Sequence, residues 1–251
     1  MKKILTVLAV AGFATGMIFA QVESPKDVLI KRITEKYKDI KEMSATIEIN
    51  MSMMGTTMKM PMKVWTKNGL TRVDASMVIP GTEQKMESTT INDGKIVTTY
   101  NNLNNTIMTI DLDKLPEELK NKVKQSTGST AGFDAELFNK IKDQIVVEET
   151  NKNGKKVYLI TVKNIEAIKN SLNMPAGNVT IPFKKILYWF DYESLNPLKM
   201  EFFTESDTPG MWIDVLEIKT FVPDGIFKVS FPPDAKKIDM TDSVKGVLQN
   251  K

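Results

Sequence analysis

The stretch MSATIEINMSMMGTTMKMPMKV, residues 43–64, decides the fold, because apolar side chains recur in it at alternate positions. Side chains on a β-strand point alternately to its two faces, so this pattern predicts two strands that each present one apolar face. We place the turn between the strands at Gly55 to Thr57. The predicted apolar face holds Ala45, Ile47, Ile49, Met51 and Met53 on the first strand and Met58, Met60, Met62 and Val64 on the second.

Methionine dominates this predicted face, whereas Lys59, Lys63 and Lys67 point to the other side of the second strand. The methionine side chain is unbranched, flexible and polarizable, so it fits against apolar partners of more than one shape. The stretch therefore predicts an apolar surface that accommodates variable apolar guests.

Turn signals at close intervals predict further strands. Asn68-Gly69, Pro80-Gly81 and Asn92-Asp93-Gly94 separate apolar or alternating segments, as in an antiparallel meander. A sheet of this size curls, and its inner face must be filled or covered. We predict a mainly β (α+β) fold, a strongly curved antiparallel sheet or half-open barrel of about eleven strands. The later strands are expected at 144–150, 156–162, 183–191, 197–205, 211–221 and 226–231.

Several helices are expected to cover the concave face of this sheet. Ser24 is a predicted N-cap and Pro25 a first helical residue, followed by an apolar stripe that includes Leu29 and Ile33. Short helices are also expected at 115–125, 134–142 and 165–172, as a lid, and a frayed helix is expected from Thr241.

The first twenty residues have the pattern of a secretory signal peptide. Lys2 and Lys3 precede an apolar run, and a small-residue cleavage site lies before Gln21. We expect an exported, periplasmic protein whose residues 21–251 form a single domain. The chain has no cysteine, so it offers neither a thiol for lipid attachment nor disulfides.

Composition argues against several classes of function. Loss of the two N-terminal lysines takes the formal charge from +3 to +1, which does not fit a nucleic-acid binder. The absence of histidine and cysteine removes the usual nucleophile–base pairs, and no phosphate-binding glycine loop occurs. Carboxylates at Asp111, Asp113, Asp191 and Glu193 follow strand ends and are interpreted as turn residues. We therefore expect no enzyme and no cofactor.

The thioethers allow one inorganic alternative. Met51, Met53, Met58, Met60 and Met62 offer soft sulfur ligands of the kind that bind Cu(I). Alternation on a strand also arises from apolar packing without a metal. A methionine-based copper-binding protein thus stays open as an alternative.

Four segments together resemble the periplasmic lipoprotein carrier family, the LolA/LolB-like proteins. Residues 64–73 resemble its tryptophan strand and the following turn, and residues 90–101 resemble its "DGK…YN" hairpin. Residues 227–233, FKVSFPP, resemble its closing strand, and Leu195-Asn196-Pro197 before a strand also fits. One position departs from the family, because the arginine–proline turn that latches the lid falls here on Asn68-Gly69.

The resemblance implies a half-open barrel with a helical lid over an apolar cavity that holds acyl chains. It implies a monomeric carrier of lipoproteins or lipids across the envelope, with an inner-membrane loading complex or an outer-membrane acceptor as partner. A sensor of envelope lipids or lipoproteins, acting through a protein partner, is the alternative within the same fold. The residues expected to line the cavity are Met51, Met53, Met58, Met60, Met62, Val64, Leu198, Met200, Phe202, Phe227, Val229 and Phe231.

Overall fold

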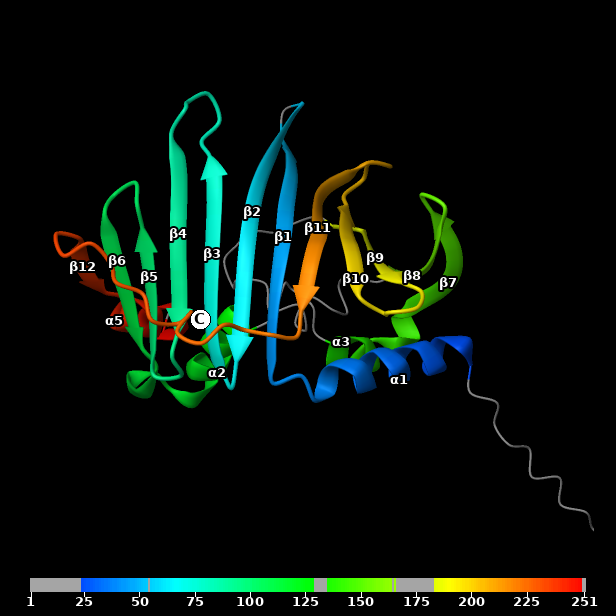
Figure 1. Cartoon of the computed structure of the whole chain (residues 1–251), viewed down its shortest axis with the longest axis horizontal. Helices are drawn as coiled ribbons and strands as arrows, with labels where there is room; N and C mark the ends of the chain where they lie inside the picture. The colour runs from blue at the N-terminus through cyan, green and yellow to red at the C-terminus, as the bar shows by residue number, and fades with distance from the viewer. Residues whose placement is uncertain (1–23, 54, 129–134, 164, 166–182, 250–251) are drawn as a thin grey trace, which may run out of the picture.

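A single curved β-sheet organises the molecule. The computed structural model describes residues 24–53, 55–128, 135–163, 165 and 183–249. Its sheet is 12-stranded, in the order β12-β6-β5-β4-β3-β2-β1-β11-β10-β9-β8-β7, and it does not close on itself (Figure 1). The predicted fold class, a mainly β, curved and largely antiparallel sheet with few helices, is confirmed.

Eleven of the twelve strands follow the expected meander. Each pairs antiparallel with its neighbours among these eleven. Their bounds are Glu42–Met53 (β1), Thr56–Lys67 (β2), Leu70–Val78 (β3), Lys85–Asn92 (β4), Ile96–Asn101 (β5), Thr106–Asp111 (β6), Ile145–Lys152 (β7), Lys155–Val162 (β8), Lys185–Asp191 (β9), Pro197–Phe203 (β10) and Pro209–Lys219 (β11).

The last strand differs from the prediction. Residues 226–231 form no strand, and the sheet ends instead with β12, Lys236–Asp239, which pairs parallel to β6. In Figure 1 the orange segment that follows β11 crosses in front of β1, β2 and β3 on its way to β12. This segment, residues 220–235, is called the outer strap below.

The hairpin of β1 and β2 forms the centre of the sheet, and its strands pair with β11 and β3 on either side. Met53 pairs with Thr56, so β2 begins directly after Gly55, and the turn is shorter than predicted. The next turn is Asn68-Gly69, between the paired residues Lys67 and Leu70. Its φ angles of 52° and 82° are those of a two-residue hairpin turn that asparagine and glycine adopt readily.

The helices α1 (Pro25–Lys38) and α3 (Ala135–Lys140) pack on each other and on one half of the sheet. Ser24 caps α1 as predicted, since its side chain accepts a hydrogen bond from the Asp27 backbone N–H at 3.2 Å. Ile33 and Phe138 are both 0% exposed and join a core with side chains of β1 and β7 to β11. We call the sheet face beneath these helices the inner face and the opposite face the outer face.

Helix α2, Glu117–Gly128, lies on the inner face of the other half, where it contacts β3. A smaller core forms there from Val97, Leu112, Leu115 and Leu119. The 3₁₀ turns η1 (Leu112–Lys114) and η3 (Lys142–Gln144) connect the strands to these helices. The predicted C-terminal helix is present as α5, Thr241–Gln249, which packs on β6.

Two of the expected segments lie wholly or mostly outside the part of the chain that the structure describes. The signal peptide at 1–20 and most of the helix expected at 165–172 lie outside the described residues. Among the helices that the structure describes, none combines the length and the apolar character needed to span a membrane.

The lid hypothesis now applies differently to α2 and α3. Helix α3 is part of the main core, whereas α2 is anchored by the smaller one. Helices with few buried contacts open at a low free-energy cost. We expect the amides of 117–123 to exchange with deuterium faster than those of α1 and the central strands, measured by fragment-resolved hydrogen exchange. Equal protection in α2 and α1 would rule out α2 as a lid.

Candidate functional site

A row of methionines crosses three neighbouring strands on the inner face. On β1, Met51 lies directly opposite Met58 on β2 and, on its other side, opposite Met211 on β11. Phe202 of β10 continues the row, since it pairs with Met211. Residues that lie directly opposite each other on antiparallel strands have their Cβ atoms about 4.5–5.5 Å apart, so these side chains contact one another.

Further methionines extend this row into a surface. Met60 pairs with Ile49 and Met62 with Ile47, while Met77 of β3 lies opposite Met86 of β4. All of these methionines are half-buried. We call the set the methionine face, and it consists of Met51, Met58, Met60, Met62, Met77, Met86 and Met211.

Three members of the methionine face were not among the residues selected from the sequence. Met77 and Met86 flank the turn at 80–84, and each continues an alternating strand. Their contribution depends on the pairing of β3 with β4. Met211 depends on the pairing of β11 with β1, which joins strands about 160 residues apart.

The inner face of the other half is filled by the protein itself. Phe138 of α3 lies edge-on to Tyr188 and Phe190, with ring centroids 5.1 and 5.9 Å away. Tyr188 and Ile160 are 2% and 0% exposed. Burial raises the pKa of the Tyr188 phenol, and its hydroxyl has no hydrogen-bond partner in the described structure. This half is a solid core, so the half-buried apolar part of the inner face is the methionine face.

The inner face becomes polar toward β5, without becoming charged. Ala75 is paired with Ser88, and Thr90 with Thr99, whose hydroxyl oxygens lie 3.0 Å apart. Across β1 to β5, no inward position of the described strands carries an ionisable side chain. The inner surface is therefore amphipathic, with thioethers on one side and neutral hydroxyls on the other.

The structure places the predicted lining residues of β1, β2 and β10 unevenly. Met51, Met58, Met60 and Met62 are half-buried on the inner face, while Val64, Met200 and Phe202 are buried in its core. The side chain of Met53 lies outside what the structure describes. Leu198 is 36% exposed, because a register shift between Pro197 and Lys199 interrupts the alternation there.

The predicted lining residues Phe227, Val229 and Phe231 belong to the outer strap instead of an inner strand. The ring of Phe231 lies 5.5 Å from that of Tyr100, which points to the outer face. The strap is also held by Arg72, whose guanidinium donates to the Ile226 carbonyl at 2.8 Å. The expectation that these three residues line the concave wall is therefore corrected, because their segment crosses the opposite face.

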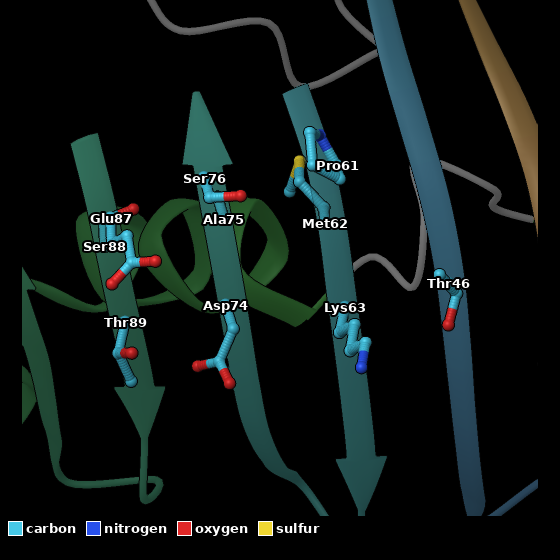
Figure 2. Close-up of a pocket in the computed structure, with 10 residues that line it drawn as sticks. All are labelled: Thr46, Pro61, Met62, Lys63, Asp74, Ala75, Ser76, Glu87, Ser88 and Thr89. Carbon is cyan, nitrogen blue, oxygen red and sulfur yellow. The ribbon is translucent and has the colours of Figure 1, made fainter. Parts of the chain in front are cut away.

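Arg72 does not latch a lid in this structure. It makes a bidentate contact with Asp74, at 2.9 and 2.7 Å, and lies 5.4 Å from the Trp65 ring centroid. All three residues have the parity of the outer face, and Figure 2 shows Asp74 on the side of its strand away from the α2 ribbon. Together with the Asn68-Gly69 turn, this position makes Arg72 an anchor for the strap.

A hollow of about 310 Å³ lies on the outer face of β1 to β4. Figure 2 shows its side chains in front of the strands, with the α2 ribbon behind them. Most lining residues are polar or charged and have outward parity, whereas Met62, Ala75 and Ser88 have inward parity, and Met62 is also part of the methionine face. The lining consists of Thr46, Pro61, Met62, Lys63, Asp74, Ala75, Ser76, Glu87, Ser88 and Thr89.

Two of the four carboxylates considered for catalysis, Asp111 and Asp191, act as local caps. Asp111 accepts from the Asp113 backbone N–H and contacts Lys114 at 2.9 Å, which lowers its pKa. Asp191 accepts from the backbone and hydroxyl of Ser194, both at 2.7 Å, and these bonds lower its pKa. Within the described ranges, no three histidine, cysteine, aspartate or glutamate side chains gather where they could hold a metal ion.

An open, curved sheet whose inner face carries no ionisable side chain across the described strands β1 to β5 defines the architecture, and solved structures with a similar fold exist. No protein-family model matches this sequence, and no curated protein matches it. An uncharacterized conserved protein from Thermus thermophilus gives a TM-score of 0.49 at 13% identity, covering 84% of this chain and 97% of that one.

Two further structures with a similar fold have descriptive names. The Mycobacterium tuberculosis lipoprotein LppX gives a TM-score of 0.40 at 10% identity, with 75% of this chain and 90% of that one covered. A LolA superfamily protein from Nitrosomonas europaea gives 0.30 at 13% identity, with 80% and 97% covered. The sequence motifs predicted a LolA-like fold, and at these identities the likeness concerns the fold alone.

Proposed function

We propose that this protein binds the acyl chains of lipids or lipoproteins on its methionine face and carries them across the bacterial envelope. The observation that supports the proposal is the contrast between the two halves of the inner face. One half is sealed by α1 and α3, whereas the methionine face presents half-buried thioethers in register across five strands.

The energetics of acyl transfer favour such a surface. Burial of a methylene contributes about 0.8 kcal/mol, so a sixteen-carbon chain represents roughly 12 kcal/mol of water avoidance. A carrier must provide much of this free energy and still release its cargo. Flexible methionines adapt to a guest without the strict complementarity that would slow its release.

The composition of the inner face also favours a particular headgroup. Across β1 to β5 its inward side chains are apolar or neutral, and Ser88, Thr90 and Thr99 supply hydroxyls at one border. A charged headgroup would lose its hydration there without gaining a counter-charge. We therefore propose ligands whose polar group beside the acyl chain is a neutral ester, amide or glycerol.

Export supports an envelope location for this activity. The N-terminal pattern of residues 1–20 predicts a cleaved signal peptide, and the chain has no cysteine for lipid attachment. We propose a periplasmic, monomeric and non-enzymatic carrier that receives its cargo from an inner-membrane complex and delivers it to an outer-membrane acceptor.

Recovery of native cargo tests the proposal directly. We expect native mass spectrometry of gently purified protein to show a mass increment, and solvent extraction to yield acyl species with neutral headgroups. Protein passed through a delipidating reversed-phase step and refolded is the control, and it should lack the increment. A protein that is empty as purified and binds no fluorescent acyl ester with an uncharged headgroup afterwards would contradict acyl carriage.

A further inference from the structure

Three thioethers converge on the inner face from three adjacent strands. Met51 on β1 has Met58 directly opposite on one side and Met211 directly opposite on the other. At about 4.5–5.5 Å between the Cβ atoms of opposite residues, flexible side chains can bring all three sulfurs to one point. We propose that Met51, Met58 and Met211 form a Cu(I) site, a second activity of the methionine face that goes beyond acyl binding.

Accessibility favours this row over the methionines that are buried in the core. All three side chains are half-buried, so a metal ion can reach the sulfurs without opening the core. Met200, in contrast, is 5% exposed and is surrounded by the core of α1 and α3. The three methionines thus lie opposite one another on adjacent strands and are partly exposed.

Ligand chemistry selects the ion. Thioethers are soft, neutral donors that suit Cu(I), while zinc and other borderline or hard divalent ions prefer imidazole, thiolate or oxygen ligands. The chain has no histidine and no cysteine to provide such competitors. The site therefore distinguishes Cu(I) from divalent ions by the type of its donors.

The absence of charged side chains on this described part of the inner face also favours Cu(I) over divalent ions. No inward position of the described strands β1 to β5 is ionisable, so nothing on this surface compensates a dication. The cost of removing an ion from water rises steeply with its charge, so a monovalent ion held by neutral sulfurs loses least. Phe202, which pairs with Met211, covers one end of the row with an apolar ring.

Competition with a chromogenic chelator tests the site. Delipidated full-length protein is titrated anaerobically with the Cu(I)–bicinchoninate complex, and the loss of its visible absorbance is followed. We expect the protein to withdraw one Cu(I) per chain. X-ray absorption of the loaded protein should show a shell of sulfur ligands only.

Isosteric variants identify the donors. Met51→Leu, Met58→Leu and Met211→Leu keep the face apolar and its volume nearly unchanged, so the fold should persist by circular dichroism. Each is expected to weaken Cu(I) binding about tenfold or more, because a methyl group replaces a soft donor. Met108→Leu, on β6 and also half-buried, is the matched control and should bind like the parent.

Three outcomes would overturn the proposal. These are no withdrawal of copper from the chelator, a nitrogen- or oxygen-rich ligand shell, or unchanged affinity in all three leucine variants. If a variant fails to fold, the ligand shell of the unmodified protein still decides between sulfur and other donors.

Discussion

Replacement of Met60 by aspartate is expected to abolish the binding of an acyl probe. Met60 is half-buried on the inner face of β2, between the rows that contain Met58 and Met62. An acyl chain on this surface would bury the new carboxylate without a partner, since the inward positions of the described strands β1 to β5 carry no charge. A loss of about 3 kcal/mol or more, roughly a hundredfold in affinity, follows from the desolvation of an unpaired charge.

Fluorescence titration with a long-chain acyl ester probe, which carries no ionisable group, measures this effect. Thr57→Asp is the matched control, because Thr57 is exposed on the same strand, on the side opposite to Met58. It adds the same charge without placing it on the methionine face, so it should leave the probe affinity within about twofold.

The pH dependence of the Met60→Asp variant provides a second measurement. Occupation of the face by an acyl chain favours the neutral carboxyl and so raises its pKa, and binding should therefore recover as the pH falls from about 6 to about 4 and level off below about 4, the ordinary pKa of a solvated aspartate. Unchanged affinity at neutral pH would remove Met60 from the site. Global unfolding of the variant would instead identify Met60 as a core residue.

The centre of the fold followed from local sequence rules. Alternation in residues 43–64 predicted both strands and their inward residues, and Asn92-Asp93-Gly94 predicted the β4–β5 turn. The Asp93 carboxylate accepts from the backbone N–H groups of Lys95 and Ile96, so the chemistry of this turn is complete within five residues. Such features need no knowledge of distant partners.

The incorrect or missing predictions depend on how the strands pair, in several cases with distant partners. Phe227, Val229 and Phe231 alternate like a strand, yet their segment pairs with no strand of the described sheet and is held by Arg72 and Tyr100. Leu198 shares the parity of Met200 but falls on a register shift against β9. Strand β12 forms by pairing with β6, which lies about 130 residues earlier in the sequence. Alternating apolar residues indicate that one side of a segment is buried. They do not indicate which face of the sheet that side packs against.

The same distinction applies to the site. Sequence parity identified the methionines of β1 and β2, but the row that includes Met211 requires the pairing of β11 with β1. Likewise, the sequence predicted helices over the concave face without indicating that one of them is part of the core. One half of the inner face is covered by a helix that is part of the main core, and a mutation in that helix, α3, measures how much the packing contributes to stability.

Phe138→Ala is expected to lower the free energy of unfolding by about 3–5 kcal/mol. The Phe138 side chain is 0% exposed, and its ring makes edge-on contacts with Tyr188 and Phe190. Truncation would leave a cavity that the sheet beneath cannot fill, because Tyr188 and Phe190 are themselves 2% and 0% exposed. A loss of this size is a large fraction of the roughly 5–15 kcal/mol typical of a folded domain.

Equilibrium unfolding in urea measures the effect, with Lys140→Ala as the control on the same helix. Lys140 is exposed, so its truncation should change the free energy of unfolding by no more than about 0.5 kcal/mol. A loss near the expected value for Phe138→Ala makes α3 part of the main core and leaves α2 as the candidate lid helix. A loss below about 1 kcal/mol would mean that α3 is loosely docked and belongs to the lid, since removal of a buried phenylalanine from a close-packed core costs more than that.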